Sequence, residues 1–277
     1  MGIGINTRFG FRVVLLAVGL CTGVVTSLLP AGFAAAAVPT PIGVDVSLLT
    51  SQTEDGDTLV SDTFSTHAGN ELLVAMFSAD GPYDPNDRVN VTVQTISSVT
   101  GCGLTWSQAS DQANYAPGVA AVFTAYATSP VSDCQVSGEL ASSFDGLVAV
   151  LSFTGAAPAL ADVRPVSNHY DSAGYGAVDV PVDGGIVYQV GHNWSAAEQP
   201  VRVSGNGTRA YQDPVPASVV GTYLSSKGDT SWVSKIDEPL PGMAPGTDTA
   251  ASIATWFSEV GYTNAVTISI RAVDTVE

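Results

Sequence analysis

The 277-residue sequence is poor in basic residues. It has 9 Lys and Arg against 26 Asp and Glu, which gives a formal net charge of −17. A strongly negative surface repels nucleic acid and anionic membranes, so we expect no nucleic-acid partner. Neutral sugars, cations or basic cell-wall polymers fit this charge better. Alternatively, the negative charge only keeps the protein soluble and has no role in binding a ligand.

The first 37 residues have the features of a secretory signal peptide. Arg8 and Arg12 precede an apolar stretch at 13–29, and the following segment at 31–37 ends in small residues. We expect cleavage after Ala37, with an uncleaved membrane anchor as the alternative. All 26 acidic residues and seven of the nine basic residues lie in the mature part, so its formal charge is −19. We expect residues 38–277 to be secreted and to have no membrane contact after cleavage.

Cysteine and histidine are also scarce, with three residues of each type. Cys21 leaves with the signal peptide, and an isolated pair in an oxidising compartment predicts a disulfide between Cys102 and Cys134. Closing this loop contributes about 3–4 kcal/mol in the chain-entropy treatment. Two cysteines without neighbouring histidines make a poor zinc site, and no partner base for a catalytic thiol is evident.

The mature part consists of short apolar runs separated by Gly, Pro, Asp, Asn and Ser. The runs lie at 70–77, 119–127, 147–153, 186–190 and 266–270. Frequent short strands predict an all-β, jelly-roll-like β-sandwich, with one domain at 38–277 or a boundary near 155–165. One short helix at most competes with this pattern, because Ile253, Trp256 and Phe257 share a helical face; their β-branched and aromatic character suits a strand equally.

Several of these runs, taken with their turns, resemble a known module. They are FSTHAGNELLVAMFSADGP (64–82), GLTWSQASDQANYAPGVAAVFTAYA (103–127), LVAVLSFTGA (147–156), GGIVYQVGHNW (184–194) and GDTSWVSK (228–235). Together they are similar to a β-sandwich accessory module of bacterial secreted proteins, found beside carbohydrate-active or adhesive domains. The resemblance implies a sandwich fold and a surface or binding role. That family has no settled activity, so it implies no catalytic residues.

Sequence patterns of hydrolases are missing. There is no Gly-x-Ser-x-Gly nucleophile elbow, and the predicted strand interiors hold almost no Asp or Glu of the kind that glycosidases pair. A polysaccharide lyase would draw on His169, Tyr170, His192 and a nearby arginine. A lyase or glycosidase on a jelly-roll scaffold is therefore the enzymatic alternative.

One turn-rich segment carries the oxygen ligands of a calcium site. DGPYDPND (80–87) brings together Asp80, Asp84, Asn86 and Asp87. Its spacing differs from that of an EF-hand, and the same composition is common in ordinary turns. We therefore expect a structural Ca²⁺ here as an alternative to a plain turn, and no other cofactor.

Aromatic residues flanked by polar ones are the candidate ligand-binding residues. Trp194, next to His192 and Asn193 in GHNW, leads this group, and Trp232 and Tyr170 belong to it. Exposed rings stack on sugar faces while amides bond the hydroxyls, whereas a tryptophan at a strand end is often buried. The sequence thus predicts a non-catalytic binding or surface module that contacts a glycan or cell-wall polymer through loop aromatics. A structural surface protein without a small-molecule ligand is the second alternative.

Overall fold

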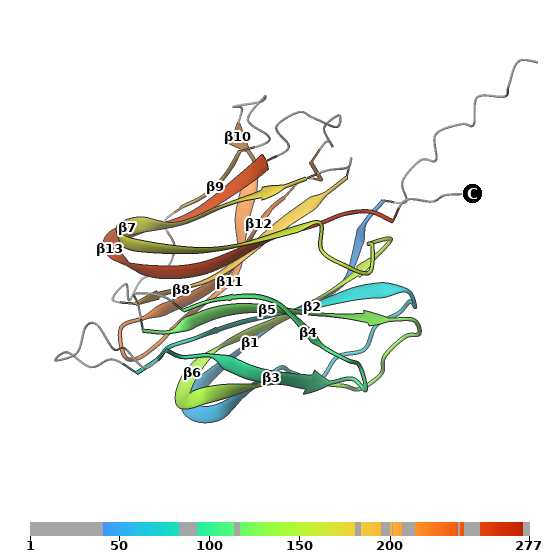
Figure 1. Ribbon diagram of the computed structural model, residues 1–277, viewed down its shortest axis with the longest axis horizontal. Helices are drawn as coiled ribbons and strands as arrows, with labels where there is room; N and C mark the ends of the chain where they lie inside the picture. The colour runs from blue at the N-terminus through green and yellow to red at the C-terminus, as the bar shows by residue number, and fades with distance from the viewer. Residues whose placement is uncertain are drawn as a thin grey trace, which may run out of the picture. The chain divides into compact units, whose positions relative to one another are not determined.

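A computed structural model gives the fold of the chain (Figure 1). It describes residues 41–82, 93–113, 117–180, 184–194, 200, 202–206, 214–237, 239–240 and 250–273, with the backbone alone at 168–172, 206, 214, 250, 259 and 260. Of the described residues, 72% lie in strands and none lies in a helix. The predicted all-β fold and β-sandwich are therefore confirmed. The signal peptide predicted at 1–37 lies outside the described residues, and Ala37–Glu277 forms one compact unit.

The first sheet contains the six N-terminal strands, all antiparallel. They are β1 (Gly43–Val60), β2 (Glu71–Ala79), β3 (Ile96–Gly101), β4 (Ser107–Gln112), β5 (Val119–Ala127) and β6 (Val136–Thr154). Their order is β1-β6-β2-β5-β4, and β3 pairs with the first part of β6. The apolar runs at 70–77 and 119–127 thus become neighbouring central strands.

The second sheet contains the seven remaining strands. They are β7 (Asp162–Asp179), β8 (Ile186–Trp194), β9 (Arg202–Asn206), β10 (Pro214–Val215), β11 (Ala217–Leu224), β12 (Thr230–Ile236) and β13 (Ala250–Ile270). Their order is β10-β9-β13-β8-β12-β11, and β7 pairs with β13 along most of its length. The two sheets lie face to face in Figure 1.

The core between the sheets is formed by every second residue of the central strands. Leu72, Val74 and Met76 of β2 face Tyr188 and Val190 of β8 in one hydrophobic cluster. The intervening residues of β2 are buried in a second cluster on the outer face of the first sheet, where the early part of β6 covers them. A strand buried on both faces reads as an unbroken apolar run, which is the pattern that its sequence shows.

The second sheet also folds back over its own outer face. β13 shifts register between Trp256 and Gly261, and Figure 1 shows β7 and β13 turning back together at this point. A third hydrophobic cluster lies between the folded-back part of the second sheet and the rest of that sheet, and it includes Val187, Ile236 and Ile253. The segment that competed for a helix is thus part of β13, because its β-branched and aromatic residues pair with β7 and β9.

The predicted disulfide is confirmed. Cys102 and Cys134 are bonded, with their Cα atoms 5.0 Å apart and a sequence separation of 32. The bond joins the turn after β3 to the segment before β6, beside the bridge between Phe64 and Cys134. The disulfide stabilises the part of the first sheet that covers the outer face of β2, and it lies outside the core between the sheets.

Candidate functional site

At one end of the sandwich, the inward-facing residues change from apolar to polar. On β2, Met76 is followed two residues later by Ser78 and then by Asp80. On β8, the corresponding series is Val190, His192 and Trp194. Alternate residues of a strand share a face, so these polar side chains continue the stacking direction of the core.

The other central strands make the same change at this end. We call the resulting set the polar layer, and its members are Ser78, Asp80, Asp145, His192, Ser225, Asp229, Ser231 and Asn264. None of them is more than 8% exposed. Burying so many polar groups costs folding free energy unless they bond to one another or to a ligand, so the layer is the strongest candidate for a functional site.

Hydrogen bonds link the polar layer across the two sheets. Ser78 Oγ, on the first sheet, donates to Gly191 O at 2.9 Å and lies 2.7 Å from Ser231 Oγ on the second. Asp145 Oδ2 accepts from Tyr223 OH at 2.9 Å and from Ser225 Oγ at 2.8 Å. These bonds connect the two sheets and orient the Asp145 carboxylate.

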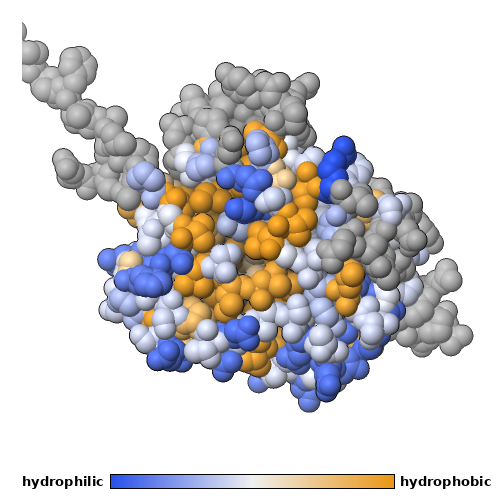
Figure 2. Space-filling view, turned by 180° about the vertical axis from the view of Figure 1, so that it is seen from behind, coloured by the Kyte–Doolittle hydropathy of each residue, from blue (hydrophilic) through white to orange (hydrophobic). Residues whose placement is uncertain are grey.

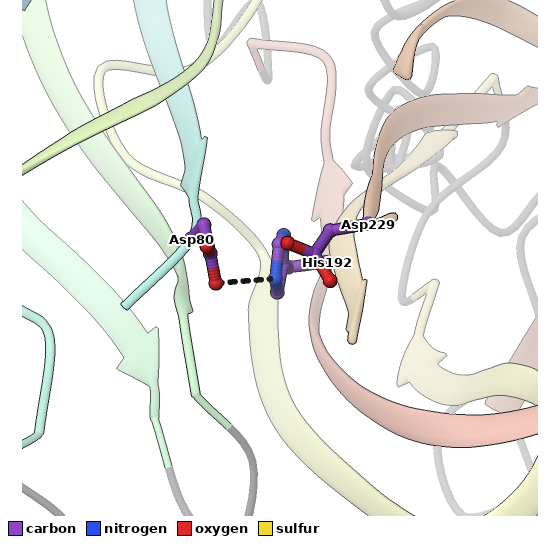
Figure 3. Close-up of side chains that lie close together, drawn as sticks. All are labelled: Asp80, His192 and Asp229. Carbon is purple, nitrogen blue, oxygen red and sulfur yellow. Dashed lines mark ion pairs between the residues drawn. The ribbon is translucent and has the colours of Figure 1, made fainter. Parts of the chain in front are cut away.

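Asp80, His192 and Asp229 point toward one another at the centre of the layer (Figure 3). One ligand atom from each side chain lies within 4.8 Å of the other two, and His192 Nε2 is 3.7 Å from Asp80 Oδ1. In the part of the chain that the structure describes, no other group of three His, Cys, Asp or Glu side chains is so close. Their exposed fractions are 6%, 1% and 3%.

Burial dominates the electrostatics of this group. It raises the pKa of Asp80 to about 7, and the negative charge of Asp229 adds to the rise. Burial lowers the pKa of His192, and the negative charges of Asp229 and Asp145 oppose that shift. The imidazole is therefore held in an environment that favours its neutral form, in which one ring nitrogen carries a lone pair.

The backbone at Gly118, just before β5, closes over the imidazole. Its φ is +99°, and a Cβ there would lie 2.3 Å from His192 Cδ2 and 2.6 Å from His192 Nε2. Asn264 Nδ2 donates to Gly118 O at 3.1 Å and holds the segment in place. Glycine is required here both by the positive φ and by the close approach.

The stretch GHNW, whose tryptophan was expected among the loop aromatics, instead lies within β8 and pairs with β12 and β13. His192 faces the polar layer, whereas Asn193 is fully buried on the opposite face against Gly261. Neither side chain is exposed to a sugar. Trp194 is half-buried at the rim, where its ring centroid lies 5.3 Å from that of Tyr262.

Trp232, a predicted ligand-binding residue, is not accessible at the surface of the folded domain. Its side chain is 0% exposed and packs against Phe257, with ring centroids 5.0 Å apart. Trp232 lies on the outer face of β12, under the part of the second sheet that folds back. Small neighbours explain the burial, since Gly174 and Gly191 leave room for the indole.

The remaining predicted residues are only partly described. The side chain of Tyr170 and all of Asp84, Asn86 and Asp87 lie outside the described residues, so the calcium loop stays a prediction. Its first member, Asp80, accepts a hydrogen bond from Gly81 N at 2.7 Å and otherwise faces His192. The sequence patterns did not indicate Asp145 and Asp229, although Asp145 lies two residues before the core residue Leu147 and Asp229 lies four residues before Val233.

The chain matches no protein-family model, no curated protein and no solved structure. The site therefore has to be interpreted from its own geometry. In the described part of the chain, no helix is long and apolar enough to cross a membrane.

Hydrophobic side chains gather on one face of the molecule, which Figure 2 shows. Among the described residues, Val44 is 47% exposed on β1, and Val219 and Leu224 are 36% and 40% exposed on β11. β1 and β11 are edge strands of the two sheets. They also lie against each other, because a Cβ atom added to Gly221 of β11 would contact Leu49 of β1. An apolar edge of this kind is a candidate protein-interaction surface.

A buried carboxylate also lies at the opposite end of β2. Glu71 is 0% exposed, and burial raises its pKa, to which the charge of Asp45 adds. Asp45 itself is hydrogen-bonded by the backbone N and ring Nδ1 of His67, at 2.7 and 2.8 Å. Burial alone would raise the pKa of Asp45, but these bonds from His67 outweigh it and lower the pKa.

We expect Glu71→Gln to make the protein more stable at pH 7 and to change its stability little at pH 4. The folded state holds the Glu71 proton more tightly than the unfolded chain does, so this group favours folding below its ordinary pKa of 4.5. That contribution is lost as the pH rises through the raised value. Urea unfolding of both proteins at the two pH values measures the difference. Exposed Glu139 on β6 is the control, and an equal effect of Glu139→Gln would contradict the assignment.

Proposed function

We propose that the mature chain is a secreted, non-catalytic binding module that contacts a glycan or cell-wall polymer at the polar end of the sandwich. The observation that carries the proposal is Trp194. Its half-buried ring lies at the rim of the polar layer, on the same strand face as His192, and beside the ring of Tyr262. Paired aromatic rings at the rim of a sandwich suit stacking on sugar faces.

The charge and the disulfide agree with this proposal. A mature part with a formal charge of −19 is better suited to neutral or cationic polymers than to polyanions. The Cys102–Cys134 bond fits an oxidising compartment outside the cell, as the predicted signal peptide also does.

We expect Trp194→Ala to weaken retention on a bound polysaccharide about two- to tenfold, since a stacked ring contributes roughly 0.5–1.5 kcal/mol. The mature protein is screened by affinity electrophoresis against insoluble and soluble glycans, and the variant is then compared on the best ligand. Trp256 is the matched control, because it is also half-buried but lies under Arg202 and bonds Ser204 on β9. Trp256→Ala should leave retention unchanged.

Retention on none of the glycans would remove the proposal. A reducing-sugar assay on the same mixtures tests the enzymatic alternative, and release of sugar ends would replace the binding module by a polysaccharide lyase or glycosidase. Asp80 and Asp229 are a pair of carboxylates that favours this alternative. Their exposed fractions of 6% and 3%, however, leave a polysaccharide little access to them.

A structural surface protein is the second candidate, and the apolar edge formed by β1 and β11 favours it. Light scattering of the mature protein separates the two. Self-association that Val44→Ser or Leu224→Ser abolishes, with no glycan retention, would support the surface protein.

A further inference from the structure

We propose that Asp80, His192 and Asp229 bind one divalent transition-metal ion, with Zn²⁺ as the reference ion. The three side chains come from the end of β2, from β8 and from the segment before β12, so the ion would tie the two sheets together. This site is independent of the proposed contact with glycans.

The first argument is the state of His192 Nε2. This nitrogen is buried, has no hydrogen-bond partner, and is directed toward Asp80 (Figure 3). At 3.7 Å from Asp80 Oδ1 it is too far for a hydrogen bond. A buried polar atom left without a partner is costly, and a cation between the nitrogen and the carboxylates would satisfy it.

The second argument is the distance between the ligand atoms. Zn²⁺ binds nitrogen and oxygen at about 2.0–2.2 Å, which places two ligands of a tetrahedral ion about 3.4 Å apart. The three ligand atoms of this group lie within 4.8 Å of one another, and the His192–Asp80 pair is at 3.7 Å. A small inward movement of the carboxylates would complete the coordination geometry.

The third argument is the support around the ligands. His192 Nδ1 lies 3.4 Å from Ser231 Oγ, which can accept a hydrogen bond from it and leave the lone pair on Nε2. The unpaired Oδ1 of Asp145 adds a further buried negative charge beside the group. Tyr223 and Ser225 orient Asp145 through its other oxygen.

The imidazole decides the class of metal. Ca²⁺ and Mg²⁺ prefer all-oxygen sites, whereas imidazole with carboxylates suits Zn²⁺ and its first-row neighbours. The site therefore differs from the calcium loop predicted at 80–87, although Asp80 belongs to both.

The test is a titration of the mature, tag-free protein with Zn²⁺, Mn²⁺ and Ca²⁺ after removal of metals with a chelator, with no glycan present. We expect one Zn²⁺ per chain and Ca²⁺ binding at least about 100-fold weaker. His192→Gln should weaken Zn²⁺ binding about 100-fold, and Ser231→Ala about tenfold. His67→Gln is the matched control, because His67 also pairs with a carboxylate but is 83% exposed, and it should bind Zn²⁺ as the wild type does.

A second measurement, by NMR on the wild-type protein, does not depend on whether the variants of the site fold. Histidine ¹⁵N resonances of the wild-type protein, assigned by elimination with His67→Gln and His169→Gln, should show Zn²⁺ shifting Nε2 of His192. Absence of Zn²⁺ binding, binding of Ca²⁺ alone, or binding that leaves the His192 resonances unchanged would each overturn the inference. Zn²⁺ binding without glycan retention would leave the inference standing and remove only the proposed function.

Discussion

Replacing Trp232 by alanine should lower the free energy of unfolding by about 3–5 kcal/mol, the range for large aromatic residues in a core. The indole is completely buried and packs edge-on against Phe257 in the small core on the outer face of the second sheet. Its neighbours belong to strands that pair on both sides, so they cannot easily collapse into the cavity. Urea unfolding followed by circular dichroism measures the change.

Two further variants make this prediction specific. Trp194→Ala should cost much less stability than Trp232→Ala, because Trp194 is half-buried at the rim. Trp232→Phe should also cost less than the alanine variant, since it keeps most of the ring volume and removes a buried Nε1 that has no hydrogen-bond partner. Equal losses for Trp194→Ala and Trp232→Ala would contradict the burial of Trp232.

Removing the disulfide should cost about 3–4 kcal/mol, mainly because the unfolded chain regains the freedom of a loop closed across a sequence separation of 32. The double variant Cys102→Ser, Cys134→Ser avoids a free thiol. Its folded state should keep the same β-rich circular dichroism spectrum, since the bond lies outside the core between the sheets. Urea unfolding measures the decrease in the free energy of unfolding.

Reduction of the wild-type protein is the control for the serine variants. It should produce a loss similar to that of the double variant, because both open the same loop. A loss below about 1 kcal/mol in both cases would mean that the segment from β3 to β6 stays ordered in the unfolded chain.

The central strands were predictable from the sequence because they are buried on both faces. The apolar runs at 119–127 and 186–190 lie within β5 and β8. The bent strands were not predictable in the same way. β7 carries many polar residues along its length, and its pairing with β13 joins residues that are 71 to 107 positions apart in the sequence.

The candidate site was predictable only in part, for a related reason. GHNW indicated His192, but its location at the end of a core-facing series was visible only once β8 was placed between β12 and β13. Asp80 was predicted as a metal ligand, but with partners from its own loop, and Asp229 resembles an ordinary turn residue in its segment. Their meeting depends on the register of two sheets, which no local pattern contains.

β13 has a mechanical consequence for the whole domain. Its last residues, including Val266 and Ile268, fill the space between the sheets, whereas its first residues, including Ile253, fill the outer compartment. One continuous strand therefore contributes to both hydrophobic clusters, so unfolding of one cluster removes the support that this strand gives to the other. Truncation within β13 is therefore expected to destabilise both clusters, because it removes core side chains and the pairing partners of β7, β8 and β9.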